Sequence, residues 1–155
     1  MKIFIFFFLS TVSCVVSAWE CGDYDKYSQS VGQHLEIASD VFFGRVLSGS
    51  VESEGENGFD VSIEVDVLLE VKGDLEDRIT LFTHSQPPFP EFILGGSYVF
   101  FLYGNTSLDF CNYLIETAVP IDSLDELREY SKRRDIRSVE QVREVLMYIE
   151  GNLNK

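Results

Sequence analysis

The chain has 155 residues, enough for one domain of ordinary size, and it carries 26 acidic residues against 12 lysines and arginines. The resulting net charge of −14 repels phosphate backbones and anionic lipids, so nucleic-acid binding and attachment to anionic membranes are excluded as expected functions. A basic protein partner, cations or simple solubility are compatible with this charge.

Residues 1–18 are predicted to be a secretory signal peptide. Lys2 is followed by the apolar run "IFIFFFLSTVSCVV" and by small residues up to Ala18, the expected cleavage site. The run is shorter than a spanning helix needs, so we expect cleavage, no membrane attachment afterwards, and a periplasmic or extracellular location. The mature chain then has 11 basic and 26 acidic residues, and 11 − 26 gives a net charge near −15. An uncleaved anchor and a lipidated Cys14 remain as alternatives.

The mature chain keeps two cysteines, Cys21 and Cys111. Exported proteins oxidise such pairs, whereas zinc sites need three or four ligands at short spacing and redox sites need Cys-x-x-Cys. The sequence therefore predicts a structural Cys21–Cys111 disulfide. Closing a loop of about 90 residues would stabilise the fold by about 4–5 kcal/mol in the chain-entropy model. No metal or cofactor site is predicted.

The first half of the mature chain predicts one helix and two strands. Apolar residues at helical spacing indicate a helix over 28–38. The segment 41–51, "VFFGRVLSGSV", indicates a strand with a bend or bulge at Gly44, and the polar segment 52–58 indicates a turn. Strict alternation over "FDVSIEVDVLLEV" predicts a strand with one wet face, and the adjacent Leu68 and Leu69 predict a bulge.

Three further strands and two helices are expected in the second half. The strands are 78–84, 98–104 and 108–120, and the one at 98–104 is apolar on both faces, which is typical of a central strand. Three prolines exclude regular sheet between 85 and 97. From Ser123 onward the pattern becomes helical, with capping-box spacing at Ser123 and at Ser138 and a C-cap at Gly151.

This order of elements predicts a mostly β, α+β fold. We expect a five-stranded OB-like Greek-key barrel with a short N-terminal helix and two C-terminal helices, which pack outside the barrel or over one open end. The expected organisation is a signal peptide at 1–18, a barrel domain at 19–120 and a C-terminal helical extension at 121–155.

Short motifs from the early cysteine to the late one carry a family resemblance. They are a helix ending "ASD", then "VFFGRV", "EVKGD", "ITLFTH" and "GGSYVFFLYG". Over residues 21–118 they resemble bacterial secreted proteins similar to the tissue inhibitors of metalloproteinases, in the netrin-like OB-fold superfamily. The resemblance implies an OB fold. The family often begins Cys-x-Cys and has a further cysteine in the loop before the "YVFF" strand. This chain has "ECGD" and "PPFPEFILGG" instead, so one family disulfide is absent, which agrees with the Cys21–Cys111 pairing.

The departures also bear on inhibition. In the animal inhibitors, a cysteine at the first position chelates the protease zinc through its amine and carbonyl. The mature chain here is expected to start at Trp19, two residues before Cys21, so the extra residues would occupy the place of the zinc. The resemblance thus implies the fold and argues against the inhibitory chemistry.

The remaining candidates for catalysis or metal binding are two histidines, an acidic row and a basic cluster. His34 and His84 are the only histidines, and no G-x-S-x-G frame surrounds a serine, so surface or half-buried positions are expected for both. The acidic row Asp60, Glu64, Asp66 and Glu70 is explained by a wet strand face, with calcium binding or acid/base catalysis as the alternative. The basic cluster "YSKRRD" is expected to balance the charges of its own helix.

The loop "QPPFPEFILGG" has an apolar tip and is the strongest candidate for binding. Partner contacts are expected at Phe89, Phe92 and Ile93, and at Trp19 and Glu20 in the N-terminal segment; the alternative is that the loop closes the barrel core. We expect an exported, monomeric, non-enzymatic module that binds a protein partner of unknown identity. A metalloprotease inhibitor and a hydrolase using His84 or the acidic strand face remain as alternatives.

Overall fold

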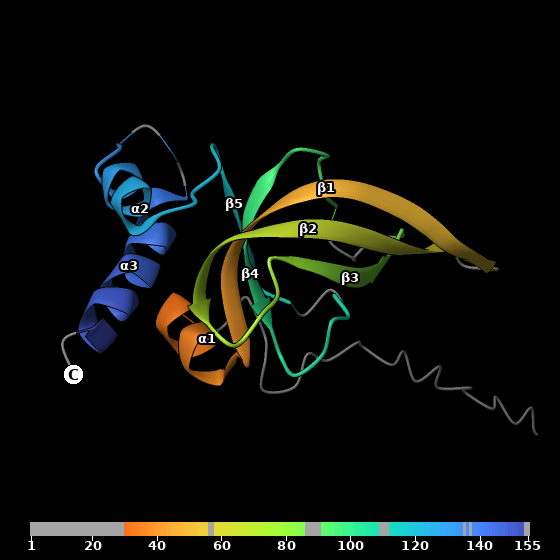
Figure 1. Ribbon diagram of the computed structural model, residues 1–155, viewed down its shortest axis with the longest axis horizontal. Coiled ribbons are helices and arrows are strands. Elements are labelled where there is room, and N and C mark those ends of the chain that lie inside the picture. The colour runs from red at the N-terminus through yellow and green to blue at the C-terminus, as the bar shows by residue number, and fades with distance from the viewer. Residues whose placement is uncertain are drawn as a thin grey trace, which may run out of the picture.

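The computed structural model describes residues 30–55, 58–85, 91–108, 112–134, 136 and 138–153. Figure 1 shows their arrangement. In chain order the elements are α1 (Val31–Ile37), β1 (Asp40–Gly55), β2 (Gly58–Lys72), β3 (Arg78–His84), β4 (Ser97–Leu102), β5 (Leu114–Thr117), α2 (Leu124–Ser131) and α3 (Val139–Leu153).

The fold is mostly β, with one five-stranded antiparallel sheet and three helices, which confirms the expected class. The strand order is β3-β2-β1-β4-β5. The chain just after β4 also contacts β3: Phe82 N–H donates to Thr106 C=O at 2.9 Å, and Leu108 N–H donates to Phe82 C=O at 2.6 Å. These bonds form a parallel bridge between Phe82 and Ser107.

β4 is an interior strand between β1 and β5, and all its residues are buried, as its apolar sequence predicts, although β1 and not β4 is the middle strand of the sheet. Its side chains alternate between two cores. Val99 and Phe101 face the helices, whereas Tyr98, Phe100 and Leu102 face the inside of the curved sheet. Burial of an aromatic side chain of this size stabilises the fold by about 2–3 kcal/mol, so this strand anchors both layers.

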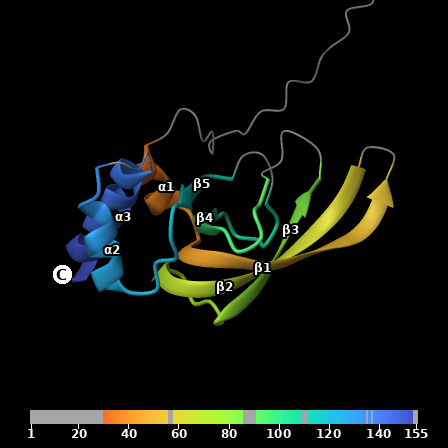
Figure 2. The same cartoon turned by 90° about the horizontal axis from the view of Figure 1, so that it is seen from above.

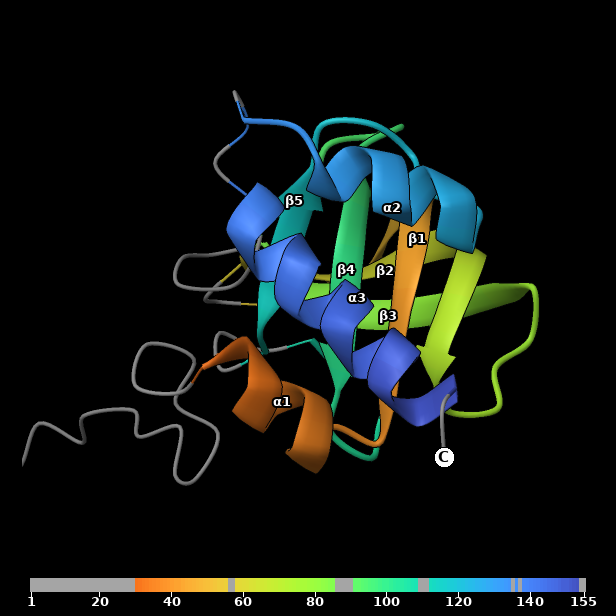
Figure 3. The ribbon, with the colours of Figure 1, turned by 90° about the vertical axis from the view of Figure 1, so that its left-hand side faces the viewer.

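The three helices cover one face of the sheet, over β1, β4 and β5 (Figure 3). α1 begins with a complete capping box between Ser30 and Gln33. At its other end, the ammonium of Lys72 from β2 donates to the carbonyls of Leu35, Glu36 and Ala38. A cation there satisfies the last carbonyls and complements the helix dipole, so α1 is fixed to the sheet at its C-terminal end.

The β1–β2 hairpin is longer than its sequence predicts. Residues 52–55, expected in a turn, continue β1, because the backbone ladder runs on through Ser53↔Asp60 to Gly55↔Gly58. The bulge expected near Leu68 is confirmed: Gly44 pairs with Val67 and Phe43 with Leu69, which leaves Leu68 as the extra residue.

Two other boundaries differ from expectation. The last strand is regular only over Leu114–Thr117, well inside the expected 108–120. α3 continues past Gly151 to Leu153, so this glycine is not the C-cap. In the described parts of the chain, no helix has both the length and the apolar character needed to cross a membrane.

Candidate protein-binding groove

The predicted binding residues fall into two groups. Trp19, Glu20 and Phe89 lie outside the described residues, as do both cysteines of the predicted disulfide. Phe92 and Ile93 are described, and they lie on the short loop that precedes β4. The structure therefore describes two of the five predicted contact residues, Phe92 and Ile93.

Phe92 and its neighbours have different environments. Phe92 is half-buried and packs on Tyr98 and Phe100, with ring centroids 5.4 and 6.0 Å apart. Ile93 and Leu94 remain 62% and 67% exposed. The loop thus combines the two predicted alternatives. Phe92 covers the inner core, and Ile93 and Leu94 form an exposed apolar tip.

Backbone hydrogen bonds fix this tip to β1. Gly95 N–H donates to Val46 C=O at 2.8 Å, and Val46 N–H donates to Gly96 C=O at 3.0 Å. Ile93 N–H donates to the Tyr98 hydroxyl at 3.0 Å. At Gly96 a Cβ would lie 2.8 Å from the Ile93 carbonyl, so only glycine allows this close turn. The exposed apolar tip is therefore held in one conformation.

A groove of about 360 Å³ lies between this tip and the sheet. Apolar side chains from β1 and β2 line it together with the end of β3 and the loop. The lining residues are Val46, Gly49, Val61, Ile63, Thr83, His84, Ser85, Glu91, Phe92 and Leu94. Gly49 and Leu94 were not among the predicted site residues. Gly49 pairs with Ile63 across the hairpin and, having no side chain, leaves the groove open at that point.

The acidic row on β2 is largely paired. Arg78 contacts Glu64 and Asp66, both at 3.2 Å, and Arg45 contacts Asp66 at 3.3 Å. The hydrogen bond to Asp66, with the charge of Glu64, raises the pKa of Arg78 above its ordinary value. Asp60 accepts from the Ser53 hydroxyl at 2.5 Å. These contacts favour a solvated, charge-paired strand face over a metal or acid/base site.

Ser53, Asp60 and His84 lie side by side on three neighbouring strands, because Asp60 pairs with both of the others across the sheet. The order of these three side chains decides whether they could act as a catalytic triad. In a nucleophilic triad the histidine lies between the serine and the carboxylate and takes the hydroxyl proton. Here the carboxylate occupies the middle position and accepts the hydrogen bond from the serine hydroxyl, so no histidine is placed to take the hydroxyl proton.

His34 was expected at the surface or half-buried, and this expectation is wrong. The ring is completely buried on the inner face of α1. It stacks on Tyr113 with centroids 4.2 Å apart, and its Nδ1 lies 2.7 Å from the Tyr103 hydroxyl. Val31 and Leu35 are buried on the same face. The helical spacing already placed His34 on this apolar face, and that signal outweighs its polar character.

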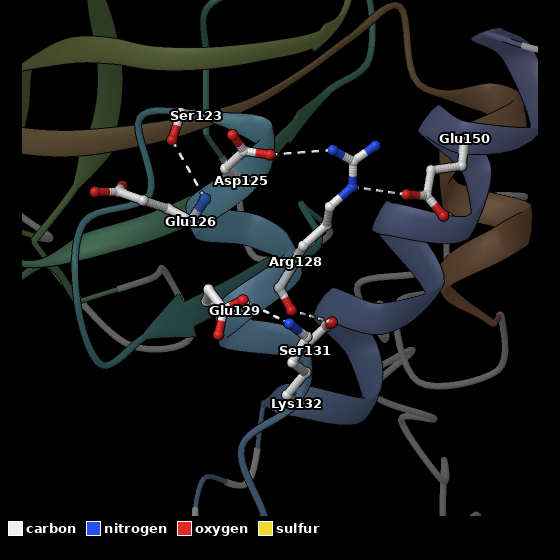
Figure 4. Close-up of polar contacts among 8 residues, drawn as sticks. All are labelled: Ser123, Asp125, Glu126, Arg128, Glu129, Ser131, Lys132 and Glu150. Atoms are coloured by element: carbon white, nitrogen blue, oxygen red, sulfur yellow. Dashed lines mark hydrogen bonds and ion pairs between the residues drawn. The ribbon is translucent and has the colours of Figure 1, made fainter.

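The C-terminal helices are joined by an ion-pair network (Figure 4). Arg128 of α2 contacts Glu150 of α3 at 3.0 Å and Asp125 one turn earlier at 3.1 Å. The hydrogen bond to Glu150, and then the one to Asp125, raises the pKa of Arg128. In the basic cluster, Lys132 pairs with Glu129 at 2.5 Å, as expected for a residue that balances charges on its own helix.

Tyr98 supports the tip, and its ionisation is expected to loosen it. Burial raises the pKa of Tyr98; the hydrogen bond from Ile93 opposes the shift and Glu116 adds to it. Because the pKa of Tyr98 is higher in the folded than in the unfolded state, the contribution of its protonated hydroxyl to folding is fully present below about pH 10, the unfolded value. This contribution is lost as the pH rises further.

Tyr98→Phe should lower the free energy of unfolding by about 1 kcal/mol at pH 7, because Ile93 N–H loses its acceptor. Above pH 10 it should show a shallower loss of melting temperature than the wild type. Parallel pH profiles for both proteins would contradict this account.

Neither a metal-binding cluster nor a family match identifies a further site in the described part of the chain. Within the described ranges, no three His, Cys, Asp or Glu side chains group so that they could hold a metal ion. The sequence matches no model of a known protein family and no curated protein. The assignment of a function therefore rests on the groove and on the exposed tip beside it.

Proposed function

We propose that the protein is an exported, non-enzymatic binding module that captures a protein partner at the groove and the Ile93–Leu94 tip. The observation that carries this proposal is the pair of large apolar side chains held exposed on a hydrogen-bonded turn. Burial of such side chains under a partner is favourable, and a fixed loop loses little conformational entropy on binding. The middle position of Asp60 between Ser53 and His84 argues against the hydrolase alternative.

We further propose that the sheet closes into an OB-like barrel, as the resemblance to the metalloproteinase-inhibitor superfamily implies. Three features support closure: the β1–β2–β3 meander, the pairing of β4 with β1, and the parallel bridge between Phe82 and Ser107. The bridge joins β3, one edge strand of the sheet, to the chain between β4 and β5, the other edge strand, and a contact between the two edges is what closes a sheet into a barrel. The groove then lies at one end of the barrel.

Export and the Cys21–Cys111 disulfide belong to the same proposal. Cys111 lies in the chain between β4 and β5. A bond to it would attach the N-terminal segment, with Trp19 and Glu20, to the sheet. The acidic composition suits a secreted protein that remains monomeric until it meets a partner.

Site-specific crosslinking tests the binding function. Leu94 is replaced by p-benzoylphenylalanine, and Met147, 59% exposed on α3, is replaced in the matched control. Irradiation in the exported fraction of the producing cells should give one discrete crosslinked protein with the Leu94 probe and none with the Met147 probe. A second test combines the Leu94 probe with Ile93→Ser, which should reduce the yield of the crosslinked product at least fivefold. Crosslinks from Met147 alone, or none from Leu94, would refute the proposed site.

A further inference from the structure

β1 is paired along both edges only in its first part. β2 pairs with it as far as Gly55↔Gly58, whereas β4 pairs with it only as far as Arg45↔Ser97. Val46 then exchanges its two hydrogen bonds with Gly95 and Gly96. Among the described residues, no backbone pairs with this second edge from Leu47 to Gly55. Figure 2 shows β1 and β2 continuing together beyond β4. An open edge of this kind can accept an extended peptide as a further strand.

The groove adjoins this open edge. The turn that carries Leu94 is bonded to Val46, the residue immediately before the edge opens. Gly49, three residues after Val46, belongs to the groove lining with Val61 and Ile63. Side chains alternate along a strand, so a strand added here would direct every second side chain towards this apolar face. Backbone pairing and an apolar contact would therefore be available to the same peptide.

The charge of the hairpin selects the kind of partner. From residue 46 to residue 65 the sequence has no lysine or arginine, and it has five acidic residues: Glu52, Glu54, Glu56, Asp60 and Glu64. Glu52, Glu54 and Asp60 are exposed, and the exposed Glu91 lines the groove. Arg45 of β1 and Arg78 of β3 are already engaged with Asp66 and Glu64.

This charge disfavours a second copy of the chain as the occupant. Edge-to-edge pairing of two β1 strands would bring the glutamates of both copies close together, and like charges on neighbouring strands are destabilising. A lysine- or arginine-bearing strand would instead find complementary charge at Glu52 and Glu54, near the end of the edge.

We propose that an extended basic segment of the partner protein adds to the edge of β1 alongside Leu47–Gly55, with one large apolar side chain in the groove over Gly49 and its cations near Glu52 and Glu54. This inference rests on the proposed binding function and names the chemistry and the mode of the interaction. Backbone pairing supplies affinity, the groove selects an apolar side chain, and the acidic hairpin selects the charge.

A designed peptide tests the mode directly. The probe is the fluorescein-labelled peptide Lys-Val-Lys-Leu-Lys-Val-Lys, measured by fluorescence anisotropy against the chain without residues 1–18. Two matched peptides replace every lysine by glutamate or the central leucine by proline. The basic peptide should bind with a dissociation constant of about 100 μM or tighter. It should weaken at least threefold between 50 and 300 mM salt, while both matched peptides lose at least tenfold.

Two variants of β1 locate the site. A Cβ at Gly49 meets only Ile63 Cγ2 and the Ser62 carbonyl, both at 3.8 Å, so Gly49→Leu fills the groove without a clash at the backbone. It should weaken peptide binding about tenfold. Ser50→Leu adds the same side chain to the opposite, exposed face of the strand and should change binding less than twofold. Hydrogen exchange should slow at the amides of 47–55 when the peptide binds.

The outcomes separate this inference from the binding function. Three results would each overturn the inference. The acidic peptide could bind as tightly as the basic one, the basic peptide could bind Gly49→Leu as tightly as the wild type, or the protected amides could lie outside residues 47–55. Self-association of the wild type that Gly49→Leu abolishes would also overturn it, because the occupant would then be a second copy. If Leu94 still crosslinks to a discrete partner in those cases, the binding function stands and only the mode is wrong. No binding of the basic peptide at 1 mM would likewise overturn the strand-addition mode.

Discussion

A chain that ends at Pro120 is expected to lose its cooperative fold. α2 and α3 share one apolar core with the sheet, where they cover Val99, Phe101 and Ile115. The two helices contribute six fully packed side chains to it: Leu127, Tyr130, Val139, Val142, Val145 and Leu146. At about 1.5–3 kcal/mol for each, their loss is comparable with the whole stability of a typical domain, about 5–15 kcal/mol.

Polar contacts also join the same helices to the sheet and to the segments that flank β5. The Tyr130 hydroxyl accepts from Ala118 N–H at 3.1 Å, just beyond β5, and Gln141 of α3 donates to the Tyr113 hydroxyl at 2.8 Å. Residues 121–155 are therefore not expected to behave as a separable extension.

The chain truncated after Pro120 should lack a near-ultraviolet circular dichroism signal and a sharp thermal transition, and it should bind an apolar dye. A control that ends at Asn152 removes the exposed Leu153 and should melt like the full chain. An unchanged transition after truncation at Pro120 would show that the helices are dispensable.

The type and order of the strands could be predicted because their signals are local. The third strand, 78–84, has the predicted limits, and the alternation of β2 identified its wet and buried faces. The length of the hairpin could not be predicted in this way. The polar residues 52–55 have a turn-like composition, but pairing with Asp60 and its neighbours extends the ladder through them. Tertiary pairing overrides weak local preference at this point.

The groove was missed because two bulges decide its shape. Between Val46↔Val65 and Ser48↔Glu64 the extra residue is Leu47, and between Val51↔Val61 and Ser53↔Asp60 it is Glu52. Each bulge changes which side chains share a face, so the register that places Gly49 opposite Ile63 is not visible in β1 alone. The exposed tip, in contrast, was predictable in part, because a Phe- and Ile-containing loop with three prolines indicates an apolar surface outside the sheet.

Gly44→Ala is expected to destabilise the protein by about 2–3 kcal/mol through overpacking. A Cβ at this position would lie 2.6 Å from Val65 Cγ1, 2.9 Å from Phe42 Cε2 and 3.1 Å from the Asp66 carbonyl. Val65 and Phe42 are completely buried, so neither can yield without moving the inner core. The position is also the point where β1 passes the Leu68 bulge of β2, and glycine there allows the two backbones to approach closely.

Gly49→Ala on the same strand is the matched control, because its Cβ would make only ordinary contacts at 3.8 Å. Removing a glycine where space is open restricts the unfolded chain, so stability should stay within about 0.5 kcal/mol or rise slightly. Thermal melts should therefore show a fall of roughly 10 °C for Gly44→Ala and almost none for Gly49→Ala. Equal effects at the two positions would mean that general strand propensity, and not the close approach at Gly44, sets the cost. An unchanged melt of Gly49→Ala would also show that the backbone at this position accepts a side chain, which the Gly49→Leu binding variant requires.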